Sequence, residues 1–237
     1  MIIGINGYAG SGKDTIGKLV QIITCPKLPD GYDLEELIAF YHVQHEWWLE
    51  EQSGWEIKKW AGKLKTIASM LTGIPESKFE DQEFKKTDLG KEWSYHYPGE
   101  YYDDGGPVMV AMSVRDFLQK LGTEGLRTGL HENTWVNALM ADYQKESYSG
   151  YVGDTRRDIP ESKWIITDTR FPNEAQAIKD AGGIVIRIDR PGVKAINAHP
   201  SETGLDSWDF DHKIMNGSDL LSLMFSVHTI LKKEKLI

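Results

Sequence analysis

The sequence predicts an α/β fold in three layers, in which a parallel sheet has helices on both faces and long loops are inserted. Short apolar runs typical of buried strands alternate along the 237 residues with segments of helical periodicity. This alternation favours a parallel sheet, because the crossover between parallel strands usually contains a helix. A glycine-rich loop joins the first apolar run to the first helical segment. We expect a single domain over residues 1–237, with insertions at about 26–54, 76–112 and 144–163.

The first half of the chain contains two strand–helix pairs. Residues 2–6 form the first apolar run, and the helix that begins at Lys13 is expected to end before Pro26. A helix over about 34–51, a short strand over 55–60 and a helix over 62–73 are expected next. From 76 to 112, charged and aromatic residues replace the periodic pattern. A long irregular stretch of this kind is either a lid or substrate-side loop, or a solvated insertion.

The second half returns to the same alternation. Ser113 is placed to cap a helix, and a second polar stretch follows at 144–163. The other expected elements are, in order, a helix over 134–143, a strand over 164–167, a helix over 172–181, strands over 184–188 and 213–215, and a helix over 219–232. Neither half completes a sheet without the other, so the polar stretches are interpreted as loops of one domain.

Composition and charge exclude several classes of protein. The formal net charge is −9, which argues against a broad surface for nucleic acid, since polyanion binding favours net positive charge. Cys25 is the single cysteine, so an internal disulfide and a cysteine metal cluster are excluded and a reducing compartment fits best. No apolar run approaches the ~20 residues that span a bilayer, and little sequence precedes the glycine-rich loop to serve as a signal peptide. We therefore expect a cytoplasmic protein that binds neither nucleic acid nor membrane.

The segment Gly7-x-x-x-x-Gly12-Lys13 has the spacing of a phosphate-binding loop, or P-loop. It follows a predicted strand and opens a predicted helix, which is the context that the motif requires. Glycines let backbone N–H groups surround a phosphate, the helix N-terminus adds positive potential, and Lys13 would bridge two phosphates of a nucleoside triphosphate. The alternative is a glycine-rich turn with a surface lysine. The residues of the loop expected to contact the nucleotide are Gly10, Ser11, Gly12, Lys13, Asp14 and Thr15.

The residue after Lys13 departs from the usual pattern. Asp14 stands where Ser or Thr commonly supplies a hydroxyl to Mg²⁺, and Thr15 follows one residue later. We expect Thr15 to lie on the Mg²⁺ side, and Asp14 to interact with the helix dipole rather than to take part in catalysis. Asp168 directly follows the strand expected at 164–167, where an acid can support the magnesium ion. The alternative for Asp168 is a cap on the following turn.

Three cationic residues are candidates to hold a second phosphate group. Arg170 lies two residues after Asp168, and its planar guanidinium suits a phosphate. Lys65 opens the helix after the second strand, and Arg115 lies in the first turn of the helix that begins near Ser113. Each alone is typical of a solvated surface, but the order of the elements would bring all three to the carboxyl end of the sheet.

Four segments of the chain, taken together, carry a family resemblance. They read GYAGSGKDT (7–15), SVRDFLQKLGTEGLRTGLHENTWVNAL (113–139), WIITDTRFPNEAQAIKDAGGIVIRIDRPG (164–192), and HPSETGLD with FDHKIMNGS (199–218). In this order they resemble the bacteriophage deoxynucleoside monophosphate kinase family, whereas 26–54 and the two polar stretches match it poorly. The resemblance implies a P-loop kinase fold and transfer of the γ-phosphoryl group of ATP, with Mg²⁺, to a 5′-deoxynucleoside monophosphate. It also suggests a homodimer and, for a phage-encoded protein, the host cytoplasm.

The resemblance assigns roles to residues by matching motif. It places Lys13 and Thr15 on the ATP side and the turn at Asn216 beside the adenine. An arginine of the family has no obvious equivalent here, because Gln82 stands near its place. The resemblance places the acceptor at Lys65, Arg115, Gly122, Thr123, Trp135, Arg170 and Glu174. Together with Asp168, which is expected from its place at a strand end, the residues expected to take part in the transfer are Lys13, Arg115, Asp168 and Arg170.

Two alternative functions stay open at this point. Another P-loop small-molecule kinase, such as a dephospho-coenzyme A kinase, would share the loop and the turn at Asn216 but take a different acceptor. A nucleotide-binding switch would bind ATP without transfer to any monophosphate. Arg115 and Arg170 argue against the switch, since a switch needs no second phosphate clamp.

Overall fold

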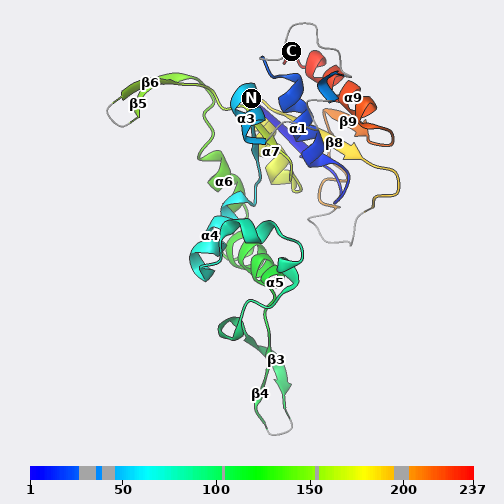
Figure 1. Ribbon diagram of the computed structural model, residues 1–237. Coiled ribbons are helices and arrows are strands. Elements are labelled where there is room, and N and C mark those ends of the chain that lie inside the picture. The colour runs from blue at the N-terminus through cyan, green and yellow to red at the C-terminus, as the bar shows by residue number, and fades with distance from the viewer. Residues whose placement is uncertain (27–35, 39–45, 103–104, 153–154, 195–202) are drawn as a thin grey trace. The chain divides into compact units, whose positions relative to one another are not determined.

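The computed structural model describes residues 1–26, 36–38, 46–102, 105–152, 155–194 and 203–237. The chain divides into two compact units, which are taken one at a time here (Figure 1). The first unit comprises Met1–Trp60 and Met140–Ile237, and the second comprises Ala61–Leu139. The single kinase domain expected from the sequence stays a prediction. The insertion expected at 26–54 lies partly outside the described residues, as does the helix expected over 34–51.

The first unit is built on a five-stranded parallel sheet in the order β2-β7-β1-β8-β9. Its strands are β1 (Ile2–Asn6), β2 (Glu56–Lys58), β7 (Trp164–Ile166), β8 (Ile184–Asp189) and β9 (His212–Met215). The central strand β1 is buried along its whole length, and its Ile3 lies opposite Ile165 on one side and Ile184 on the other. The predicted parallel sheet is therefore confirmed, with β1 at its centre.

Helices cover both faces of this sheet. They are α1 (Lys13–Ile23), α3 (Glu46–Ser53), α7 (Pro172–Asp180) and α9 (Leu220–Lys233). Ile3 and Ile5 share one hydrophobic core with apolar side chains of α1 and α9. Successive residues of a strand face opposite sides of the sheet. The side of Gly4 that a Cβ would occupy therefore faces the other layer, where Ile178 of α7 lies against it. The three-layer arrangement predicted from the sequence is thus confirmed.

The second unit has its own small core of Ala68, Phe79, Leu89, Val114 and Phe117. Its elements are α4 (Gly62–Thr72), the 3₁₀ turns η1 (Glu76–Glu80), η2 (Phe84–Lys86) and η3 (Lys91–Trp93), the antiparallel strands β3 (Tyr95–Tyr101) and β4 (Pro107–Val110), α5 (Val114–Gln119), the π-helix η4 (Lys120–Thr128) and α6 (Thr134–Met140). The Ser113 hydroxyl accepts a hydrogen bond from the Asp116 backbone N–H at 3.1 Å, so the predicted cap is confirmed.

Two expectations about the polar stretches were wrong. The stretch 76–112 is not irregular throughout, because it contains three 3₁₀ turns and a β-hairpin. The stretch 144–163 likewise contains an antiparallel hairpin of β5 (Tyr148–Val152) and β6 (Thr155–Ile159). In both, charged and aromatic residues stand where strand prediction looks for apolar alternation. No helix among the described residues combines the length and the apolar character needed to cross a bilayer.

Candidate phosphate-binding site at the carboxyl edge of the sheet

The loop between β1 and α1 has a backbone that requires glycine at two positions. Gly10 and Gly12 have φ angles of 80° and 106°, a region that residues with a Cβ rarely adopt. The Ser11 N–H donates to the Tyr8 carbonyl at 3.1 Å and closes the turn before α1 begins. A Cβ on Gly12 would lie 2.7 Å from Asn216 Nδ2, whereas no atom lies within 4 Å of one on Gly10. The loop is therefore braced at Gly12 and open at Gly10, where a ligand can approach the backbone.

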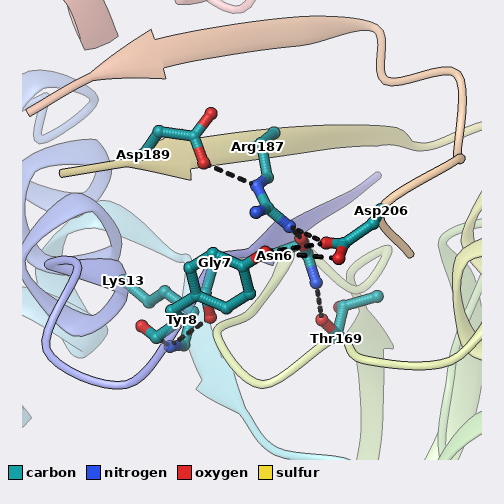
Figure 2. Close-up of polar contacts among 8 residues, drawn as sticks. All are labelled: Asn6, Gly7, Tyr8, Lys13, Thr169, Arg187, Asp189 and Asp206. Atoms are coloured by element: carbon teal, nitrogen blue, oxygen red, sulfur yellow. Dashed lines mark hydrogen bonds and ion pairs between the residues drawn. The ribbon is translucent and has the colours of Figure 1, made fainter. Parts of the chain in front are cut away.

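Lys13 folds its side chain back over this loop. Its Nζ donates to the Gly7 carbonyl at 2.7 Å and to the Tyr8 carbonyl at 2.9 Å (Figure 2). The ammonium group is thus held at the loop by oxygen atoms. Phosphate oxygens accept the same kind of hydrogen bond and carry a charge that strengthens it.

Asn216, in the turn after β9, braces the loop from the side. Its Nδ2 donates to the Ser11 carbonyl at 2.8 Å, and its backbone N–H donates to the Asp189 carbonyl at 2.7 Å. Arg190, the residue after β8, donates to the Gly10 carbonyl at 3.2 Å. Asn216 therefore lies beside the loop, and its expected contact with adenine stays a prediction.

Asp14 connects the first turn of α1 to the end of β7. Its Oδ1 accepts a hydrogen bond from the Thr167 hydroxyl at 2.7 Å and lies 3.9 Å from Lys59 Nζ. The carboxylate also lies at the positive end of the helix dipole, as predicted. Thr15 is half-buried beside it. Both residues line a cavity of about 460 Å³ together with Lys18, Gln21, Glu50, Ile57 and Lys59.

Asp168 lies directly beyond β7, as the sequence predicts. Its Oδ1 accepts a hydrogen bond from the Trp60 backbone N–H at 2.8 Å. The Trp60 indole Nε1 lies 3.4 Å from the hydroxyl of Thr169. Asp168 therefore connects the end of β7 to the segment after β2.

Glu174 fixes the backbone at Arg170. Glu174 is 2% exposed, and its Oε2 accepts from the Arg170 N–H at 2.8 Å and from the Phe171 N–H at 3.1 Å. These contacts cap the N-terminus of α7. They leave the Arg170 side chain exposed at the carboxyl edge of the sheet. A role of Glu174 toward the acceptor stays a prediction, and the contacts shown are to the backbone.

Sequence reasoning missed Arg187, which lies at the centre of this edge. Its side chain donates to Asn6 Oδ1 at 2.6 Å, to Asp189 Oδ1 at 2.8 Å and to Asp206 Oδ1 at 3.3 Å (Figure 2). Burial alone would lower the pKa of Arg187, but hydrogen bonds with Asp189 and Tyr8 outweigh burial and raise it. The guanidinium is therefore permanently charged. The available signal was an arginine inside the otherwise apolar run of β8.

The other predicted acceptor residues belong to the second unit. Lys65 pairs with Glu80, and Arg115 donates to Gln82 Oε1 at 3.3 Å, where the family arginine was expected. The indole N–H of the buried Trp135 donates to the carbonyl of Gly122 at 2.9 Å. Gly122 and Thr123 lie in the π-helix, a rare conformation that is frequent at functional sites. The first unit holds the other predicted residues, which are Gly10, Ser11, Gly12, Lys13, Asp14, Thr15, Asp168, Arg170, Glu174 and Asn216.

Comparison with known proteins decides the family. Residues 107–227, more than half of the chain, match the family model described as deoxynucleotide monophosphate kinase. The chain belongs to the deoxynucleotide monophosphate kinase family. The resemblance drawn from the sequence is thereby confirmed.

Three viral proteins are also similar in sequence to this member of the deoxynucleotide monophosphate kinase family. A protein of Acanthamoeba polyphaga mimivirus is 37% identical over 100 residues, which cover 39% of this chain and 47% of that protein. The deoxynucleotide monophosphate kinase of Enterobacteria phage T4 is 32% identical over 120 residues, 51% of this chain and 46% of that protein. The deoxynucleoside-5′-monophosphate kinase of Escherichia phage T5 is 26% identical over 246 residues, 92% of this chain and 90% of that protein. The chain thus spans about half the length of the first two relatives and nine tenths of the third.

The family match and the loop geometry are independent observations. The matched residues 107–227 include Arg115, Asp168, Arg170 and Asn216, but they exclude the loop before Lys13. The loop is therefore supported by its own backbone geometry, and the family by a separate part of the chain.

Proposed function

We propose that this family member transfers the γ-phosphoryl group of ATP to a 5′-deoxynucleoside monophosphate and forms the diphosphate. The observation that carries the proposal is the glycine-rich turn with the Lys13 ammonium held over it, at the carboxyl end of the central strand. Ligands of open α/β sheets bind at this edge. The names of the phage relatives support the acceptor class.

The residues beside the loop fit a magnesium ion. Thr15 offers a hydroxyl and Asp168 a carboxylate, and Mg²⁺ prefers such oxygen ligands together with phosphates and water. We assign these two residues to the ion. Bound there, the ion would neutralise charge that develops on the transferred group.

The protein itself needs no covalent nucleophile for this reaction. Phosphoryl transfer needs two anionic substrates held in line and their charge neutralised. Lys13 serves the ATP phosphates, and we assign Arg115 and Arg170 to the acceptor phosphate because a guanidinium binds phosphate through paired N–H groups. Lys65, Gly122, Thr123, Trp135 and Glu174 complete the proposed acceptor group.

The test is a coupled assay of ADP release with ATP and Mg²⁺. The acceptors are dGMP, dTMP, dCMP, dAMP and their ribose counterparts. We expect turnover with some deoxynucleotides and a loss on the order of 10²–10³-fold in kcat for Lys13→Met, the size reported for removing one charge-stabilising donor. Lys213→Met, an exposed cation of β9, is the matched control. Arg115→Ala and Arg170→Ala should raise the acceptor KM and leave the ATP KM near its starting value.

Other results would assign other functions. Turnover with a coenzyme A precursor but with no monophosphate would identify the second type of small-molecule kinase. ATP binding without transfer to any acceptor would identify a nucleotide-binding switch. Light scattering of the purified chain tests the homodimer, and the phage relatives favour action in the cytoplasm of an infected host.

A further inference from the structure

Arg187 connects three segments at the carboxyl edge of the sheet. It lies on β8 opposite Asn6 of β1, and its side chain is 9% exposed. One of its N–H groups reaches Asn6, another reaches Asp189 at the end of its own strand, and Asp206 comes from the segment before β9 (Figure 2). An arginine is suited to this role because its N–H donors have a fixed, planar arrangement.

The same guanidinium holds the first half of the phosphate loop through Tyr8. The centre of the guanidinium lies 4.5 Å from the centroid of the Tyr8 ring. The Tyr8 hydroxyl donates to the Asp206 carboxylate, with distances of 3.1 Å to Oδ1 and 3.2 Å to Oδ2. The Tyr8 carbonyl in turn accepts from Lys13 Nζ at 2.9 Å. The side chain of Tyr8 is thus fixed by Arg187 and Asp206, and its backbone holds Lys13.

Asn6, the last residue of β1, is fixed in the same way. Its Oδ1 accepts from Arg187, and its Nδ2 donates to the Thr169 carbonyl at 2.8 Å. Asn6 is 5% exposed, and it directly precedes Gly7, whose carbonyl also accepts from Lys13. Both carbonyls that hold Lys13 are therefore close to Arg187 in the chain of contacts. Tyr8 contacts Arg187 directly, and Gly7 follows Asn6, which does the same.

The charge of Arg187 is already balanced within the protein. Asp189 and Asp206 both form ion pairs with it. A cation compensated by two carboxylates adds little long-range attraction for an anionic ligand. The arrangement of its contacts, rather than its charge, is what Arg187 contributes to the loop.

We propose that Arg187 is a positioning residue for the phosphate loop, which acts on bound nucleotide through Tyr8 and Asn6, and that Asp206 completes this support. The inference rests on the proposed nucleotide binding by the loop and adds residues that neither the motif nor the family match assigns. Displacing reactive groups by about 1 Å can cost on the order of 10²-fold in rate. Loss of Arg187 should therefore weaken nucleotide binding and transfer without any lost contact to the nucleotide itself.

The experiment compares Arg187→Met with Arg187→Lys by calorimetric titration with ADP, below the unfolding temperature of each variant. Lysine keeps the charge but cannot make the three directed contacts. We expect the ADP Kd to rise about tenfold or more in both variants. In turnover assays the ATP KM should rise while the acceptor KM stays near its starting value. A Kd restored to that of the unaltered protein by lysine would show that charge alone matters and would overturn the proposal.

Milder variants keep the test decisive if Arg187 variants fail to fold. Tyr8→Phe keeps the ring over Arg187 and loses the hydroxyl, and Asp206→Asn weakens the ion pair. Each should raise the ADP Kd about two- to tenfold, the range of one hydrogen bond, and the double variant should show less than the product of the two effects. Unchanged affinity in both single variants would overturn the proposal.

A matched control uses the ion pair between Lys179 of α7 and Asp211, which precedes β9. Lys179 Nζ lies 2.6 Å from Asp211 Oδ1, and Asp211 also accepts from the Val185 N–H of β8. Lys179→Met should lower the unfolding temperature but leave the ADP Kd unchanged, and an equal rise in Kd would make the Arg187 effect a general loss of stability. Because ADP binding needs no acceptor, the Kd tests Arg187 even if no monophosphate is phosphorylated. Absence of ADP binding by the unaltered protein would overturn both proposals.

Discussion

Gly10 and Gly12 lie two residues apart in the same loop, and both have left-handed φ angles. Their surroundings differ, since a Cβ on Gly10 meets open space and one on Gly12 lies 2.7 Å from Asn216 Nδ2. Alanine at either position carries the cost of the left-handed backbone, about 1–2 kcal/mol. Alanine at position 12 must also displace the Asn216 side chain, which then loses its hydrogen bond to the Ser11 carbonyl.

The magnitude of the difference follows from that one hydrogen bond. A typical hydrogen bond contributes about 1 kcal/mol to the free energy of unfolding. Gly12→Ala should therefore be about 1 kcal/mol more destabilising than Gly10→Ala. The next nearest atom to the added Cβ, Ile188 Cδ1 at 3.5 Å, is in ordinary contact and adds no further cost.

The assay is urea unfolding followed by circular dichroism, for both variants and for each combined with Asn216→Ala. The alanine at position 216 removes the obstructing amide and the hydrogen bond together. The difference between Gly10→Ala and Gly12→Ala should then vanish. The reasoning is refuted if the difference persists without the Asn216 side chain, or if Gly12→Ala is no more destabilising than Gly10→Ala.

Three further predictions concern groups outside the loop. Burial, followed by the nearby Lys232, lowers the pKa of His228 from 6.5, so the folded protein favours the neutral imidazole. The free energy of unfolding should be level above pH 6.5 and should fall as the pH drops from 6.5 toward the lowered pKa. Unfolding measured from pH 5 to 8 should show this fall, and His228→Gln should abolish it. Glu174→Ala leaves two backbone N–H groups without their carboxylate acceptor and should lower the free energy of unfolding by about 2 kcal/mol in urea. Glu174→Gln should recover part of this loss, and an alanine variant as stable as the unaltered protein would contradict the cap. Trp135→Phe keeps a buried ring but loses the bond to the Gly122 carbonyl, so unfolding should be about 1 kcal/mol easier, and an unchanged midpoint would show that this bond contributes nothing.

The parts of the fold that could be predicted depend on local signals. The apolar residues 2–6, the glycines after them and the periodic residues from Lys13 specify a strand, loop and helix without reference to the rest of the chain. Ser113 at a helix start and Asp168 beyond β7 were predicted for the same reason, because a cap or a strand end is recognisable within a few residues. Asp168 could thus be placed at the edge, but its Trp60 partner, more than a hundred residues away, could not.

The parts that could not be predicted depend on pairing between distant segments. Arg187 meets Asn6 because β8 and β1 are adjacent and in register, and the two residues are 181 positions apart. The hairpin at 95–110 was missed for a different reason. Its strands contain exposed tyrosine and methionine side chains, Tyr101 and Met109, so they lack the buried apolar face that identifies a strand. The π-helix could not be told from an α-helix either, because it directly continues α5 in the chain.

Asp14 shows how a departure from a motif is accommodated by its surroundings. A carboxylate next to Lys13 would repel a bound phosphate if it faced the loop. Its side chain is instead 76% exposed and is directed to the Thr167 hydroxyl, with Lys59 at 3.9 Å. Water and the lysine screen its charge, and the start of α1 favours an acid. The loop can therefore keep its positive potential without a hydroxyl at position 14, and the Thr15 hydroxyl, one residue later, is the group that we propose for a magnesium ion.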